Sequence, residues 1–139
     1  MCQEQIKEIL DISGVSERLG VCFDTCHVFA AGYDFRTKKS YRHLLKEFDN
    51  IVGLNYLKLF HINDSKSRLG SRLGRHDHPG EGFIGLEPFS FFLNDTRFAE
   101  VPFLLETPNG ADTDGINRDI VNLRLLKSLI GMKIKDDCI

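Results

Sequence analysis

The sequence lacks long hydrophobic runs, an excess of either charge, and paired cysteine motifs. No apolar stretch approaches the roughly 20 residues that a transmembrane helix needs, and the opening segment MCQEQIKEIL does not have the pattern of a signal peptide. Because 18 basic residues face 20 acidic ones, the net charge of −2 argues against nucleic-acid binding by bulk charge alone. The composition of these 139 residues, 42% of them hydrophobic, is that of one soluble globular domain with no membrane partner.

The cysteines are few and unpaired in the sequence. Cys2, Cys22, Cys26 and Cys138 form no C-x-x-C pair and no zinc-ribbon spacing. Two lie near the ends of the chain, and two lie in or just after an apolar run. This usage is typical of reduced thiols, so we expect a cytoplasmic protein, or a nuclear one if the organism is a eukaryote.

Helical and strand-like patterns alternate along the chain, and no internal repeat or linker divides residues 1–139. The predicted helices cover residues 3–12, 41–52, a segment beginning at Glu87-Pro88, and about 114–130. The predicted strands cover residues 20–24, 56–61 and 101–106. Strands separated by helices imply right-handed crossovers, so we predict an α/β fold with a parallel sheet of about three strands and flanking helices.

Each predicted strand ends in a polar residue that can bind a metal ion. These residues are Asp24, His61 and Glu106. Because the carboxyl ends of parallel strands form one edge, we expect the three side chains to converge there, as a carboxylate–imidazole set suited to Zn²⁺ or Mn²⁺. Taken singly, each has a structural alternative: Asp24 as a helix cap, His61 as a hydrogen-bonded core residue, and Glu106 as a solvated side chain.

Two further groups lie within reach of this edge. His27 follows Asp24 by three residues, which places it beside the strand end on the first turn of a helix. His76, Asp77 and His78 lie in a later loop and could bind a second ion. They could equally form a pH-sensitive surface patch.

Residues 63–85 are polar and glycine-rich and show no apolar period, which predicts a long loop. Loops longer than about 12–15 residues are usually functional or disordered. The segment concentrates donors that suit phosphate, namely Lys66, Arg68, Arg72 and Arg75 with Ser65, Ser67 and Ser71. A solvated basic loop is the alternative. Beside a metal cluster, however, the loop indicates metal-assisted hydrolysis of a phosphodiester.

Three motifs resemble the endonuclease IV family of apurinic/apyrimidinic endonucleases. The first is GVCFDTCH with FAAGYD at residues 20–34, and the second runs from HINDSK at 61–66 through GSR and RH to GEG at 80–82. The third is LLETP at 104–108. The match covers nearly the whole chain but only the C-terminal part of the family's fold.

The resemblance implies part of a (β/α)₈ TIM barrel that, when complete, holds three zinc ions and cleaves double-stranded DNA 5′ to abasic sites during base excision repair. It implies that Asp24, His61 and Glu106 are zinc ligands, Glu106 being the candidate catalytic residue in that role. It also implies that His27 and His76 hold another zinc. The phosphate-binding donors of the loop make Lys66, Ser71, Arg72 and Arg75 the candidate DNA contacts.

The sequence differs from the family pattern in two ways that affect the activity expected of this chain. Gly74 stands where the family has a zinc-binding aspartate, and Asp77 or His78 is a candidate replacement. A closed barrel typically takes roughly 250 residues, so residues 1–139 would be a partial barrel domain without its N-terminal strands. We therefore expect weak or no activity from the chain alone.

Three alternative functions remain open for this sequence. The first is a catalytically inactive fragment that binds metal or DNA. The second is a split or oligomeric barrel completed by another chain, which would cover the two open edges of a three-stranded sheet. The third is a sugar isomerase-like barrel, against which the basic loop argues because a neutral sugar has no phosphate to bind.

Overall fold

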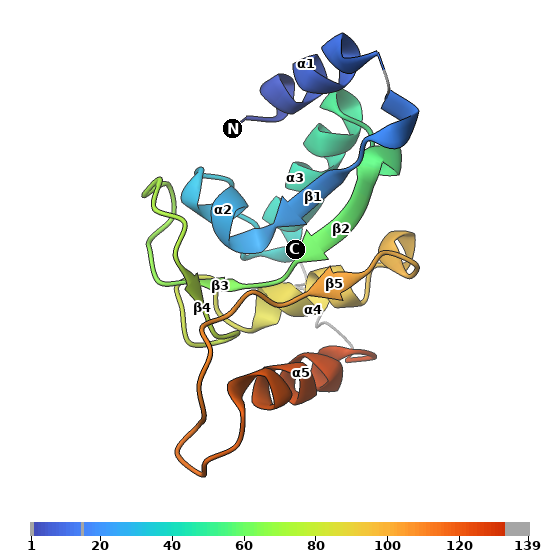
Figure 1. Ribbon diagram of the computed structural model, residues 1–139. Helices are drawn as coiled ribbons and strands as arrows, with labels where there is room; N and C mark the ends of the chain where they lie inside the picture. Colours follow the sequence, from blue (N-terminus) through green and yellow to red (C-terminus); the bar gives the residue numbers. More distant parts are fainter. Residues whose placement is uncertain (1, 15, 133–139) are drawn as a thin grey trace.

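A computed structural model describes residues 2–14 and 16–132 (Figure 1). Its main sheet has three parallel strands in the order β1 (Val21–Asp24), β2 (Leu57–His61) and β5 (Phe103–Leu104). The predicted parallel α/β fold is confirmed. Asp24 pairs with His61, and His61 pairs with Leu104, so the three strands end in register at one edge. β5 is shorter than the predicted strand at 101–106, and Glu106 lies two residues after its end.

Five α-helices are present in the described part of the chain. They are α1 (Gln3–Ser13), α2 (Thr25–Ala30), α3 (Lys38–Ile51), α4 (Glu87–Leu93) and α5 (Arg118–Leu129). Short 3₁₀ turns cover Ser16–Arg18, Leu54–Tyr56 and Thr96–Phe98. Among the described residues no helix is long and apolar enough to cross a membrane.

Local hydrogen bonds explain where the helix limits differ from the predicted ones. α3 begins before residue 41 because Thr37 caps it, its hydroxyl accepting the backbone N–H of Ser40 at 3.1 Å. α5 begins later than residue 114 because the Asp112 carboxylate accepts the backbone N–H groups of Asp114 and Ile116 in a tight turn. The helix then begins after its own cap residue, Asn117.

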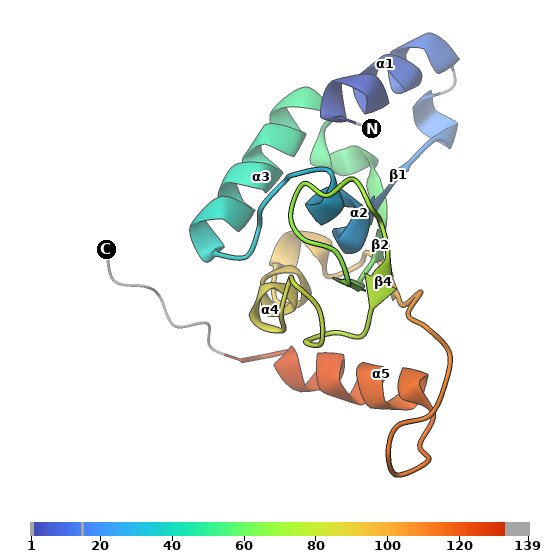
Figure 2. The same ribbon diagram turned by 90° about the vertical axis from the view of Figure 1, so that its left-hand side faces the viewer.

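The core lies between the sheet and the helices α3 and α4, which cover one of its faces (Figures 1 and 2). Phe60 of β2 stacks on Phe103 of β5, with ring centroids 4.7 Å apart. Phe92 of α4 contacts the rings of Phe23 in β1 and Phe60 in β2, each at 5.5 Å. This aromatic contact therefore fixes the strands that carry the candidate site residues.

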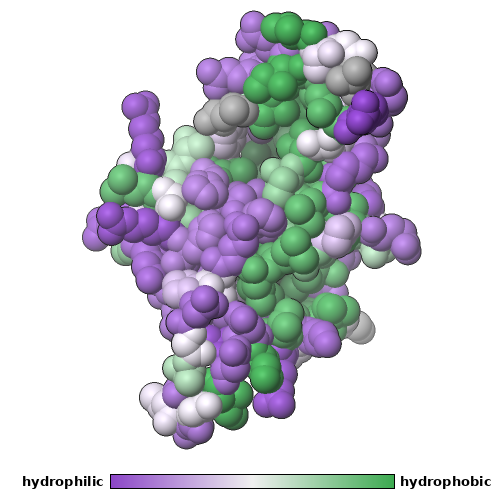
Figure 3. Space-filling model, viewed as in Figure 1, coloured by the Kyte–Doolittle hydropathy of each residue, from purple (hydrophilic) through white to green (hydrophobic). Residues whose placement is uncertain are grey.

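The opposite face of the sheet is covered by no helix of the described chain (Figure 1). Cys22 is exposed there, Leu59 is half-buried, and Leu104 is 50% exposed. Figure 3 shows apolar surface running across this side of the molecule. We refer to Cys22, Leu59 and Leu104 together as the open sheet face.

The predicted loop at residues 63–85 contains more structure than its composition indicates. Two short strands within it, β3 (Asp64–Ser65) and β4 (His76–Asp77), pair antiparallel. The backbone N–H groups of Gly70 and Arg72 donate to the carbonyls at the end of α2, at 3.1 and 2.9 Å. These bonds hold the loop against α2 and bring His76 toward the main sheet.

Candidate metal centre

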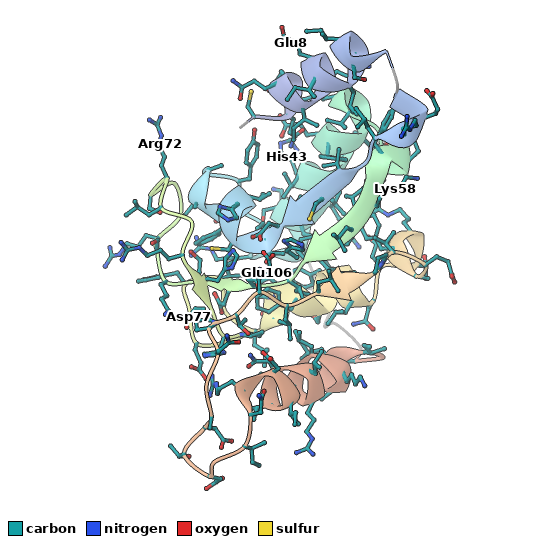
Figure 4. All side chains as sticks on the ribbon, viewed as in Figure 1. Glu8, His43, Lys58, Arg72, Asp77 and Glu106 are labelled. Carbon is teal, nitrogen blue, oxygen red and sulfur yellow. The ribbon has the colours of Figure 1, made fainter. Side chains whose placement is uncertain are left out.

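The polar residues at the strand ends come together as predicted. The Nδ1 atom of His61 lies 2.8 Å from Glu106 Oε2 and 3.5 Å from Asp24 Oδ2. Figure 4 shows Glu106 beside the ends of β1 and β2. Alternation along β2 explains how His61 reaches this position, because His61 and Leu59 point to one side while Phe60 points into the core.

The two predicted histidines from α2 and β4 join the same cluster. His76 Nε2 lies 3.3 Å from Asp24 Oδ2, and the rings of His27 and His76 have centroids 5.2 Å apart. Two groups of three side chains result, Asp24 with His27 and His76, and Asp24 with His61 and Glu106. Within each group the ligand atoms lie within 4.8 Å of one another.

Asp24 belongs to both groups and also caps a helix. Its Oδ1 accepts the backbone N–H of His27 at 3.0 Å and so caps α2. Its Oδ2 faces the ring nitrogens of His61 and His76. The structural alternative for Asp24 is therefore correct for one oxygen, while the other remains available to a metal ion.

Asn63, which sequence reasoning did not single out, connects the strand ends. Its buried side chain accepts the backbone N–H of Glu106 through Oδ1 at 2.8 Å and donates from Nδ2 to Asp24 Oδ2 at 3.3 Å. Its backbone exchanges hydrogen bonds with the hydroxyl of Thr25 at 2.9 and 2.6 Å. Its position directly after a strand end, inside the HINDSK motif, was the available signal.

Asp64 holds the loop at residues 63–85 in place through hydrogen bonds to its backbone. Its buried carboxylate accepts the backbone N–H groups of Ser65, Gly80 and Ile84 at 2.7–2.9 Å. Burial raises the pKa of this carboxyl. A Cβ at Gly82 would lie 2.5 Å from Asp64 Oδ1, so only glycine fits there.

Asp77 and His78 lie outside both ligand groups. The Asp77 carboxylate accepts the backbone N–H of His78, and the His78 ring pairs with the Asn122 amide at 2.9 Å. Asn122, buried on α5, also donates to Thr107 Oγ1 at 3.1 Å. This network ties α5 to the segment that follows Glu106, and the structure brings neither Asp77 nor His78 into the place of a ligand at Gly74.

The predicted DNA-contacting residues lie along the loop beside the cluster. Lys66, Arg72 and Arg75 are exposed and Ser71 is half-buried. Arg72 adopts a positive φ of 61° and projects from the tip of the loop (Figure 4). The bonds that hold the loop to α2 bring Arg72 near His27, and both residues line one pocket.

The donor set fits a divalent metal ion. It combines carboxylates with imidazoles, the ligand types that bind zinc in proteins. His76 Nε2 is buried and has no hydrogen-bond partner among the described residues, although Asp24 Oδ2 faces it at 3.3 Å. A cation between the two atoms would satisfy both of them.

Replacing Asn63 by alanine is expected to weaken metal binding by about 10–100-fold, because ligand-orienting partners typically contribute that much. It should also lower the free energy of unfolding by about 1–3 kcal/mol, since the Glu106 N–H loses its acceptor. Metal titration and urea unfolding would measure the two effects. Asn94→Ala is the matched control, because that amide bonds Ser90 and Leu129 on α4 and α5. Equal metal affinity in the two variants would contradict the prediction.

Comparison with known proteins supports the predicted resemblance. Residues 2–127 match the family model described as xylose isomerase-like TIM barrel. The chain is 50% identical over 127 residues to the probable endonuclease 4 of Geobacter sulfurreducens. It is 52% identical over 107 residues to the apurinic-apyrimidinic endonuclease of Caenorhabditis elegans.

The structural comparison agrees with the sequence comparison. The crystal structure of endonuclease IV from Thermus thermophilus superposes with a TM-score of 0.74 at 35% identity, over 91% of this chain. The chain covers 43% of that structure, 42% of the Geobacter protein and 27% of the nematode protein. It therefore spans less than half the length of these relatives.

Proposed function

This chain belongs to the family of xylose isomerase-like TIM barrels, and we propose on this premise that it supplies the metal- and DNA-contacting part of a zinc-dependent phosphodiesterase acting at abasic sites in DNA. The observation that carries the proposal is the cluster of Asp24, His27, His61, His76 and Glu106 beside an exposed basic loop. The names of the relatives point to the same substrate.

Each part of the site has a task in this proposal. Zinc, when bound, would supply an activated water and stabilise the negative charge of the transition state. Glu106 holds His61 in place through its carboxylate, and its backbone carbonyl bonds His76 Nδ1. Lys66, Ser71, Arg72 and Arg75 bind the phosphates of double-stranded DNA on either side of the lesion.

Residues 1–139 act as a partial barrel domain in this proposal, and a second polypeptide completes the barrel. β1 and β5 each pair only with β2 in the described chain, so both edges of the sheet are open. The open sheet face is apolar, and its burial would stabilise an assembly. The three free cysteines of the described chain, Cys2, Cys22 and Cys26, suit a cytoplasmic or nuclear compartment, and Cys138 lies outside the described residues.

The test is incision of a labelled abasic-site duplex with added Zn²⁺, by the chain alone and mixed with the segment of the Geobacter protein that it does not match. We expect little or no incision by the chain alone and metal-dependent incision by the mixture. Glu106→Gln should lower the rate of the mixture by about 100-fold through loss of a metal-site carboxylate.

Light scattering on the same mixture would report whether the two parts associate. A complex that forms and binds zinc but does not cut abasic DNA would overturn the proposed activity. It would favour the second candidate, an inactive metal- or DNA-binding protein, which the half-length match to the relatives supports.

A further inference from the structure

We propose that the first half of helix α3 is a second DNA-contacting surface, on which Lys39, Arg42 and Lys46 bind the phosphate backbone of duplex DNA outside the lesion. We call these three residues the basic stripe. This inference rests on the proposed action on DNA and adds a contact surface to the loop at residues 63–85. None of the candidate metal ligands among the described residues, and none of the three family motifs, lies on α3.

Positive charge is concentrated in this segment of a chain that is acidic overall. Residues 36–46 contain five basic side chains and no acidic one, although the whole chain has a net charge of −2. Lys39, Arg42 and Lys46 are spaced three and four residues apart, so they lie along one face of the helix. All three are exposed, and no acidic side chain of the described residues pairs with them. Their charges are therefore available to a partner.

The charges of α3 run against the helix dipole. The first turn of a helix favours acidic side chains, and the last turn favours basic ones. α5 follows this rule, with Asp119 in its first turn and Lys127 in its last. α3 does the opposite, since Lys38 and Lys39 stand in its first turn and Asp49 in its last. A charge order that lowers helix stability is expected where the side chains serve binding.

The basic stripe points away from the sheet. The opposite face of α3 is buried in the core and consists of Tyr41, Leu44, Leu45 and Phe48. α3 also lies on the covered side of the sheet, across from the open sheet face (Figure 1). A second polypeptide that buries the open sheet face would therefore leave the basic stripe accessible to DNA.

The start of α3 adjoins the basic loop. The backbone N–H of Arg72 donates to the carbonyl of Ala30 at 2.9 Å, and a Cβ on Gly32 would lie 3.9 Å from Gly70 Cα. Residues 31–37 run from there beside the loop to the start of α3 (Figure 2). At 1.5 Å per residue the basic stripe is about 10 Å long, which is the axial span of roughly three phosphates on one DNA strand. The loop and the basic stripe together therefore suit a longer stretch of backbone than the loop alone.

Binding of an undamaged duplex tests the proposal, measured by fluorescence anisotropy with the full chain in EDTA, so that neither metal nor lesion contributes. The logarithm of the affinity falls linearly with the logarithm of the salt concentration, with a slope of about −0.9 for each phosphate contact. We expect the combined change Lys39→Gln, Arg42→Gln and Lys46→Gln to make that slope shallower by about 2–3. Binding at about 50 mM salt should weaken at least about tenfold.

The matched control removes the same number of positive charges from other elements, through Arg18→Gln, Lys58→Gln and Lys127→Gln. These three side chains are exposed, and we expect the control to change the slope by less than about one. Glutamine has nearly the helix propensity of lysine and arginine, so α3 should remain folded in the test variant. Urea unfolding should show that this variant is at least as stable as the parent, because Lys39 no longer opposes the dipole.

The proposal is overturned if the parent chain does not bind the duplex, or if the α3 variant binds it with the parent's affinity and slope. The second result would favour an acidic protein as the partner of the basic stripe. An equal loss of slope in both triple variants would also overturn it, because net charge alone would then explain the binding. Each of these outcomes leaves the proposed incision untouched, whereas α3-dependent binding without incision in the mixture would overturn the proposed function alone.

Discussion

Replacing Asp64 by alanine lowers the free energy of unfolding by about 3–5 kcal/mol, a large share of the stability of an ordinary domain. The carboxylate accepts three backbone N–H groups, from Ser65, Gly80 and Ile84. Each buried donor that loses its acceptor costs about 1–3 kcal/mol, and the sum is reduced because a buried carboxylate is itself costly. Urea unfolding followed by circular dichroism measures the loss.

Two control variants separate the hydrogen bonds from other effects of the change. Asp64→Asn keeps one accepting oxygen and should lose less stability than alanine does. Asp77→Ala removes a half-buried carboxylate from the same hairpin that accepts the backbone N–H of His78, and we expect a loss below about 1 kcal/mol. If Asp64→Ala and Asp77→Ala are equally stable, the buried carboxylate does not hold the loop as described.

The pH dependence of this loss follows from the pKa of Asp64, which burial raises. The folded chain therefore binds the proton more tightly than the unfolded chain does. The contribution of Asp64 to stability is fully present below the ordinary carboxyl pKa and declines as the pH rises through the folded pKa. The loss caused by Asp64→Ala should consequently be larger at about pH 4 than at about pH 7. A constant or growing loss would contradict the direction of the shift.

The cluster of candidate ligands was predictable because it depends on short-range periodicity. Asp24, His61 and Glu106 were placed together from strand alternation and from the common edge of parallel strands. The register of β1 and β2 agrees for Asp24 and His61, and Glu106 reaches His61 from just beyond the end of β5. His27 was predictable from helical spacing after Asp24. The topology follows from these local patterns, since α2 and α3 lie between β1 and β2 in the chain and α4 lies between β2 and β5.

The supporting residues were not predictable in the same way, because their roles depend on contacts between distant segments. Asn63 bonds Asp24 and Glu106, which lie 39 and 43 residues away in the sequence. Asp64 bonds Gly80 and Ile84 across the hairpin, and no local period marks these pairs. The prediction of a long loop missed β3 and β4 for this reason, as two-residue strands leave no hydrophobic pattern.

The structure does not bring Asp77, a candidate ligand, into either ligand group of the described residues. Asp77 was a candidate ligand because it adjoins His76, but successive residues of β4 point in opposite directions. His76 turns toward Asp24, while Asp77, the second residue of β4, belongs to neither ligand group (Figure 4).

Replacing Phe92 by alanine is the second large effect that we expect, a loss of about 3–5 kcal/mol. Phe92 is 1% exposed, and its ring contacts those of Phe23, Phe35, Tyr41 and Phe60 at 4.8–5.5 Å. Truncation leaves a cavity between α4 and the strands that cannot close without moving β1 or β2. Urea unfolding measures the loss, and Phe92→Leu should recover part of it by filling the cavity.

Phe83→Ala is the matched control for Phe92→Ala, because that ring is 47% exposed and contacts the Arg68 guanidinium at 5.6 Å. We expect Phe83→Ala to lower the free energy of unfolding by less than about 1 kcal/mol.

Phe92→Ala should also affect the candidate metal site, since Phe23 immediately precedes Asp24 and Phe60 immediately precedes His61. A core that shifts at Phe92 therefore shifts both candidate ligands, Asp24 and His61. We expect Phe92→Ala to weaken metal binding even where the chain remains folded. Unchanged metal affinity in folded Phe92→Ala would show that Asn63 and the loop hold the ligands without help from the aromatic core.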